Sequence, residues 1–186
     1  MSCFEIVDLI VQLVVKIAPV GTLIVAFIQI YQNKKSREED IKRYQPTRIS
    51  AWYEDGRDSA DCPQDNRFAW VMVMLRNESE SPVYDVVVTC VGTSGTGPAS
   101  RGEDNNSDYS CRVCIQTLPP GLWSTWLPTE GCGMHTYTAL EIAFTDANGT
   151  SWVRRGNGKL EEIKLNPSEF YKLSLPIEWG RCKRVG

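Results

Sequence analysis

The N-terminal part of the chain is dominated by one apolar run, residues 9–30, which Gln12, Lys16 and Gln29 interrupt. A helix of this length rises roughly 33 Å, enough to cross a hydrocarbon layer of about 30 Å. Lys16 would cost about 2.5–3.5 kcal/mol at the centre of a bilayer, but its long side chain can reach the nearer interface. The pattern therefore predicts a transmembrane helix over residues 9–31, after a short N-terminal tail, residues 1–8. The alternative is a helix buried in a protein core.

Five basic residues follow this run and form a basic collar: Lys34, Lys35, Arg37, Lys42 and Arg43. The residues before the run instead carry Glu5 and Asp8, and they lack the positive region of a cleaved secretory signal. Basic flanks favour the cytoplasmic side of a membrane. We therefore expect a single-pass protein of the cell membrane, with its N-terminus outside and its C-terminal domain in the cytoplasm. Residues 32–46 are expected to form a charged juxtamembrane helix that Pro46 ends.

Polar residues recur at four-residue spacing in the first part of the run, at Asp8, Gln12 and Lys16. This spacing places them on one face of a helix. One interpretation is a stripe for association of two helices, which would give a homo-oligomer. The other is a set of side chains that reach toward one membrane interface.

Beyond Pro46 the hydrophobic period changes from helical to two, which is typical of strands with one buried face. Leu140, Ile142 and Phe144, for example, alternate with Glu141 and Ala143, and this assigns Glu141 to a solvent face. The pattern predicts seven strands: residues 48–54, 68–75, 84–91, 111–118, 123–127, 140–145 and 151–155.

The connections between these segments support an all-β domain. Asn148-Gly149 separates two predicted strands and is a strong hairpin signal, and Asn157-Gly158 offers a second turn. Short strands without a helical period between them favour an immunoglobulin-like antiparallel β-sandwich over residues 47–178. The closing stretch, residues 166–186, would either add an edge strand or hang free, and its last part, residues 179–186, forms a basic C-terminal tail.

Three short motifs carry a resemblance to a group of proteins: PVYDVVV, TLPPG and FTDANGTSWVRRGNGKL. Together with the apolar run and its collar, they resemble uncharacterised small membrane-anchored proteins of Gram-positive, high-GC bacteria. The resemblance implies a single membrane span and a cytosolic β-sandwich, and it implies no activity.

The cysteines provide the sharpest chemical hypothesis. Four residues, Cys111, Cys114, Cys132 and His135, have a spacing close to that of a zinc site with three Cys ligands and one His ligand, and His135 is the only histidine. Against it, Cys111 and Cys114 lie on one predicted strand and three residues apart, so their side chains should point to opposite faces. Buried or surface thiols are the alternative interpretation.

Charge and motif content exclude several functions. The net charge of -3 and the pI of about 5.3 argue against a nucleic-acid binder. The chain has no P-loop, nucleophile elbow or dinucleotide fingerprint, so we expect no catalysis and no cofactor. The expected function is a membrane-anchored binding or scaffolding module, whose partners are the lipid bilayer and an unidentified protein. Two alternatives are an exported surface domain with disulfides and a zinc-stabilised domain with a hydrolytic role.

Overall fold

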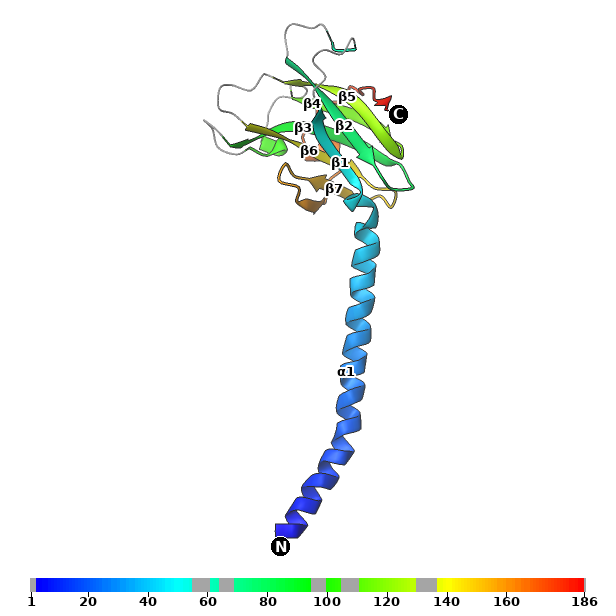
Figure 1. The fold of residues 1–186 in the computed structure, drawn as a ribbon, viewed down its shortest axis with the longest axis vertical. Helices are drawn as coiled ribbons and strands as arrows, with labels where there is room; N and C mark the ends of the chain where they lie inside the picture. Colours follow the sequence, from blue (N-terminus) through cyan, green and yellow to red (C-terminus); the bar gives the residue numbers. More distant parts are fainter. Residues whose placement is uncertain are drawn as a thin grey trace. The chain divides into compact units, whose positions relative to one another are not determined.

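The computed structural model describes residues 3–54, 61–63, 69–94, 100–104, 111–129 and 137–185, and it leaves out the side chains of residues 3–20 and 22. The chain divides into two compact units, Met1–Arg43 and Tyr44–Gly186. The first is helical, and the second contains two antiparallel β-sheets (Figure 1).

A single helix, α1, runs over Cys3–Thr47, so the residues predicted as a span and as a juxtamembrane helix are continuous. It ends one residue after Pro46, as the sequence predicts. Most of the predicted span, residues 9–20 and 22, lies outside the residues whose side chains are described. The basic collar lies farther along α1, where all five of its residues are exposed.

The predicted membrane localisation is wrong, because none of the described helical residues form a stretch long and apolar enough to cross a membrane. A span needs about 20 predominantly apolar residues. In the described part of α1 the apolar residues between Leu23 and Ile30 give way to a charged segment that begins at Lys34. The predicted topology, with the N-terminus outside and a cytoplasmic domain, is therefore contradicted as well.

All seven predicted strands are present, and the described residues contain two further strands after them. The strands are β1 (Ile49–Glu54), β2 (Ala69–Asn77), β3 (Val83–Ser94), β4 (Arg112–Leu118), β5 (Gly121–Thr129), β6 (Tyr137–Thr145), β7 (Ser151–Arg154), β8 (Leu160–Ile163) and β9 (Lys183–Arg184). One sheet has the order β1-β2-β5-β9 and the other β4-β3-β6-β7-β8, with antiparallel pairing throughout.

The main core lies between these two sheets. Val73 and Leu127 of one sheet pack in the same cluster as Val88 and Ile142 of the other, and all four are buried. Trp152 on β7 belongs to this cluster, and its Nε1 donates a hydrogen bond to Asp146 Oδ2. The alternation of apolar residues therefore fills the space between two sheets, which is the arrangement of a β-sandwich.

A second, smaller core covers the outer face of the sheet that contains β6. Helix α2 (Pro167–Phe170) and Tyr171 lie over this face, where they cover Val87, Cys114 and Ala143. Residues on both faces of β6 are consequently buried. The predicted solvent position of Glu141 is wrong for this reason: its exposed fraction is 1%.

Two hairpin turns carry the Asn-Gly pairs that the sequence marks as turns. In the β6–β7 turn, Asp146 N donates to Thr150 O, and in the β7–β8 turn, Arg155 N donates to Lys159 O. Gly149 has a φ of +80° and Gly158 a φ of +86°, a conformation that glycine adopts without the steric cost of a Cβ. The β7–β8 turn fixes the direction of Arg155 and Lys159.

The C-terminal residues lie along strand edges. Strand β9 pairs with β5, and Gly180 N donates a hydrogen bond to Cys114 O on β4. Of the two alternatives for the closing stretch, residues 166–186, the structure shows the one in which it adds an edge strand, β9.

Candidate functional site

A polar cleft with a volume of about 560 Å³ opens beside the β7–β8 turn. Its lining comes from β3, β6, the β7–β8 turn and β8, and from the segment that precedes η1 (Gly102–Asp104). The lining residues are Val91, Gly92, Thr93, Ser100, Arg101, Glu141, Arg155, Gly156, Asn157, Lys159 and Glu161. Apart from the glycines, Val91 is the one apolar residue in this described lining.

Glu141 forms the floor of the cleft. Its Oε1 accepts hydrogen bonds from Tyr171 Oη at 2.8 Å and from Gly102 N at 3.2 Å, and its Oε2 lies 3.2 Å from Arg155 Nη1. Burial, followed by the nearby charge of Glu141, raises the pKa of Tyr171 well above its usual value, so this phenol stays a donor. A buried carboxylate needs such partners to offset its lost hydration.

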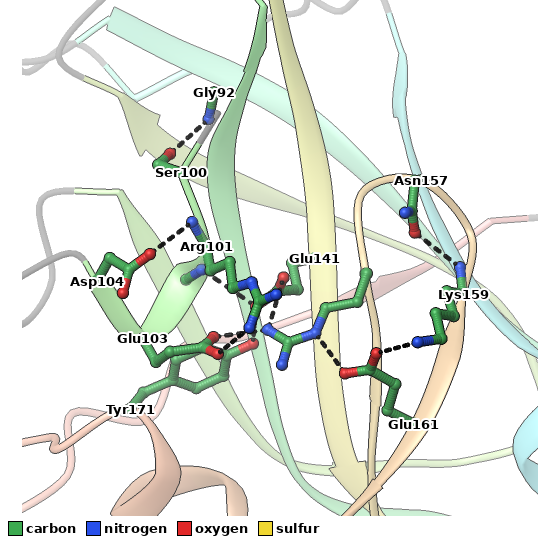
Figure 2. A network of polar contacts seen from close by, with 12 residues as sticks. Gly92, Ser100, Arg101, Glu103, Asp104, Glu141, Asn157, Lys159, Glu161 and Tyr171 are labelled. Atoms are coloured by element: carbon green, nitrogen blue, oxygen red, sulfur yellow. Dashed lines mark hydrogen bonds and ion pairs between the residues drawn. The ribbon is translucent and has the colours of Figure 1, made fainter. Parts of the chain in front are cut away.

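Arg155 joins Glu141 to two further carboxylates, Glu103 and Glu161. All three glutamates are labelled in Figure 2. Arg155 Nη1 lies 2.6 Å from Glu103 Oε2, and its Nε lies 3.0 Å from Glu161 Oε2. Burial opposes the charge on this guanidinium, but the hydrogen bonds to Glu103 and Glu161 and the charge of Glu141 outweigh it and raise its pKa. Arg155 therefore remains a fixed cation at the base of the cleft.

Arg112 supports this network from the second core. Its Nη1 donates to Tyr171 O and its Nη2 to Gly102 O, and its guanidinium lies over the Tyr171 ring at 5.1 Å. Packing at Gly102 is so tight that a Cβ there would come within 2.5 Å of the Tyr171 ring. The residues around Glu141 are consequently held in one arrangement by the fold.

The exposed charges at the rim are cationic. The side chains of Arg101 and Lys159 are 70% and 69% exposed, whereas those of Glu161, Glu103 and Glu141 are 32%, 23% and 2% exposed. Lys159 Nζ lies 2.9 Å from Glu161 Oε1, and Figure 2 shows the two side chains together on one side of the network. Arg101 Nη1 lies 4.0 Å from Glu103 Oε1, so the two cations are the most exposed charged groups of the lining and each is paired with a carboxylate.

This arrangement favours binding over acid–base chemistry. Each of the three carboxylates is paired with Arg155, and Glu141 also accepts two further hydrogen bonds. The bonds that Arg155 makes with described residues use Nε and Nη1, which leaves Nη2 to donate to a ligand. A ligand with a negatively charged acceptor would match Nη2 and the two rim cations.

A second cleft, of about 670 Å³, lies elsewhere on the sandwich and is lined by Arg48, Arg76, Asn77, Glu78, Gly121 and Leu122. The Arg76 and Glu78 side chains are about half exposed and pair with each other. Asn77 is buried, but its amide donates to Ser81 O and Leu118 O and so closes a turn. We regard the Glu141–Arg155 cleft as the candidate site because only there, among the two, do buried ionised groups converge on the opening.

The predicted zinc ligands are only partly within the described residues. Cys114 is buried in the second core, whereas Val113 and Ile115 face the main core, so this strand alternates as expected. Cys132 and His135 lie outside the described residues. The described part of the chain contains no group of three or more metal-ligating side chains. The zinc site stays a prediction.

Cys114 should make the stability of the protein depend on alkaline pH. Burial raises the pKa of its thiol from 9.0 to about 11, and Arg112 opposes this only in part. The folded state therefore keeps the proton that the unfolded state releases above about pH 9, and its stability falls as the pH rises from 9 to 11. We expect Cys114→Ala to lose less stability over this range, by up to about 2 kcal/mol.

Urea unfolding of both proteins at pH 8.0 and pH 10.5 measures this difference. All other ionisable groups are common to the two proteins, so their contributions cancel in the comparison. Equal losses of stability in wild type and Cys114→Ala would show that the thiol does not resist ionisation.

The residues of the cleft were missed at the sequence level. Glu141 stands in an alternating strand where a carboxylate usually faces water, and Tyr171 lies 30 positions farther along the chain. The sequence does place Arg155 and Lys159 on either side of Asn157-Gly158, so a turn flanked by two cations could be predicted from it. No local pattern pairs that turn with Glu103.

Comparison with known proteins finds no family model that matches the chain and no match among curated proteins. The resemblance to small bacterial proteins therefore rests on the sequence motifs alone.

Proposed function

We propose that the β-sandwich is a non-catalytic protein-binding module whose cleft receives an acidic side chain, Asp or Glu, of a protein partner. The observation that carries this proposal is the fixed Arg155 cation at the base of the cleft, below two exposed cations, Arg101 and Lys159. Carboxylates form strong, charge-assisted hydrogen bonds with guanidinium groups that the fold has already oriented.

The lining of the cleft favours a side chain of a protein over a drug-sized molecule. Small-molecule pockets are lined mostly by apolar and aromatic side chains, whereas most residues of this lining are polar or charged and none is aromatic. The walls are a hairpin turn and a loop segment, Ser100 and Arg101, at the surface of a rigid sandwich. Such loops are the usual binding elements of β-sandwich proteins.

The immunoglobulin-like topology is part of the proposal. Strands β1, β2 and β5 lie in one sheet and β3, β6 and β7 in the other, which matches the order of strands A, B, E and C, F, G in an immunoglobulin domain. In this scheme β4 extends the second sheet beside β3, and β8 is an addition after β7.

Titration of the ¹⁵N-labelled full chain with the peptide acetyl-Gly-Glu-Gly-amide tests the proposal. We expect saturable shifts of the Arg155 side-chain resonance and of the amides of Gly92 and Asn157. The same peptide with Gln in place of Glu should bind at least tenfold more weakly, because it lacks the charge that Arg155 and the rim cations recognise.

Two variants distinguish binding of the Glu peptide in the cleft from its general attraction to a basic surface. The double variant Arg101→Gln/Lys159→Gln should weaken binding of the Glu peptide at least fivefold. Lys164→Gln removes an exposed lysine outside the lining and should bind as wild type does. Equal binding of the Glu and Gln peptides, or equal effects of the two variants, would refute the proposed role of the cleft.

A further inference from the structure

Two cysteines lie directly opposite each other at one end of the β3–β4 pair. The register pairs Val88 with Val113 and Thr89 with Arg112, so the next pair is Cys90 and Cys111. Cys90 N donates a hydrogen bond to Cys111 O at 3.0 Å, which shows that the pairing extends one residue beyond Arg112, the first residue of β4.

The two side chains share one face of the sheet, because residues directly opposite each other in an antiparallel pair point the same way. Cys90 packs against the main core, and its Sγ accepts a hydrogen bond from Tyr53 Oη at 3.0 Å. Cys114, three residues after Cys111, lies in the second core on the other face. Cys111, which directly precedes β4, is therefore the cysteine that faces Cys90.

The spacing of such a pair suits a disulfide. Hydrogen-bonded residues in opposite positions have Cα atoms about 5.5 Å apart, within the range of about 4.4–6.8 Å found in disulfides. Both cysteines are free in the structure, and both residues are half-buried rather than enclosed in the core.

We propose that Cys90 and Cys111 form a reversible intramolecular disulfide by exchange with a low-molecular-weight disulfide such as oxidised glutathione. The thiolate of one cysteine attacks a sulfur of the glutathione disulfide and releases one glutathione thiolate. The thiolate of the other cysteine then attacks the protein sulfur of this mixed disulfide and releases the second glutathione. The protein loses two electrons and two protons, and one glutathione disulfide becomes two thiols.

The bond would close the loop between β3 and β4. This loop carries Ser100, Arg101 and Glu103, which contribute to the cleft and its network. A disulfide across its base restricts the unfolded chain and so stabilises the folded one. The disulfide is a property of this cysteine pair and does not depend on what the cleft binds.

Peptide mapping of the full chain tests the pair directly. The reduced protein is incubated with oxidised glutathione under native conditions, remaining thiols are alkylated with iodoacetamide, and the products are digested and analysed by mass spectrometry. We expect one predominant cross-linked species that joins the peptides of Cys90 and Cys111 and disappears after reduction. The thermal unfolding midpoint should rise by several degrees and return after reduction.

Single variants identify the partners. In Cys90→Ser, Cys111 should be trapped as a mixed disulfide with glutathione, and Cys111→Ser should trap Cys90 in the same way. Cys62→Ser, which removes another half-buried thiol, should leave the cross-link unchanged. A wild-type protein in which Cys90 and Cys111 stay alkylated, or in which either is linked to a different cysteine, would overturn the proposal whether or not the cleft binds acidic peptides.

Discussion

Glu141→Ala is expected to lower the free energy of unfolding by about 3–5 kcal/mol, because it removes a buried carboxylate that Arg155, Tyr171 and Gly102 all contact. Arg155 would retain Glu103 and Glu161 but lose the contact at 3.2 Å. Tyr171 Oη and Gly102 N would both lose their acceptor, and both residues are buried. Denaturation by urea, followed by tryptophan fluorescence, measures the change.

Glu54→Ala is the matched control, since it removes an exposed glutamate from strand β1. Its free energy of unfolding should stay within about 0.5 kcal/mol of wild type. A loss of less than about 1 kcal/mol in Glu141→Ala would mean that the network contributes little to the fold, and the fixed arrangement of Arg155 would then need another explanation.

Trp152→Ala should cost a similar amount, about 3–5 kcal/mol, by a different mechanism. Trp152 is among the largest fully buried side chains, with an exposed fraction of 1%, and its loss leaves a cavity in the main core. The substitution also removes the hydrogen-bond donor to Asp146 Oδ2. The other carboxylate oxygen of Asp146, Oδ1, accepts hydrogen bonds from the backbone N–H groups of Asn148 and Thr150. The β6–β7 turn should loosen as a result.

Two further tryptophan variants separate these contributions. Trp152→Phe keeps most of the buried volume and loses the hydrogen bond, so it should cost about 1–3 kcal/mol. Trp52→Ala, at a position 36% exposed, should have a clearly smaller effect than Trp152→Ala. Equal losses at Trp52 and Trp152 would contradict the assignment of Trp152 to the core.

The sandwich could be predicted to a large extent because its signals are local. A period of two and the Asn148-Gly149 and Asn157-Gly158 turns locate strands and hairpins within a few residues of their positions in the structure. The edge strand β9 consists of two residues and is held by pairing with β5, so no periodicity marks it. The same applies to β8, which has four residues.

The length of the apolar run over residues 9–30 and the basic collar after it predict a membrane span, and the described residues do not support it. The cleft was missed for a different reason. A carboxylate in an alternating strand is assigned to solvent unless something covers that face, and α2 and Tyr171, which cover Glu141, follow it by more than 20 positions. Contacts over such distances in sequence are set by tertiary packing and leave no trace in the local pattern.

The most direct test of the proposed function is the position of a bound acidic side chain in the cleft. Intermolecular nuclear Overhauser effects between the Glu methylene protons of acetyl-Gly-Glu-Gly-amide and the side chain of Arg155 would provide it. We expect such effects to Arg155 and Lys159, and their loss when Gln replaces Glu in the peptide. Effects confined to residues near Arg48 and Arg76, which line the other cleft, would contradict the proposed function.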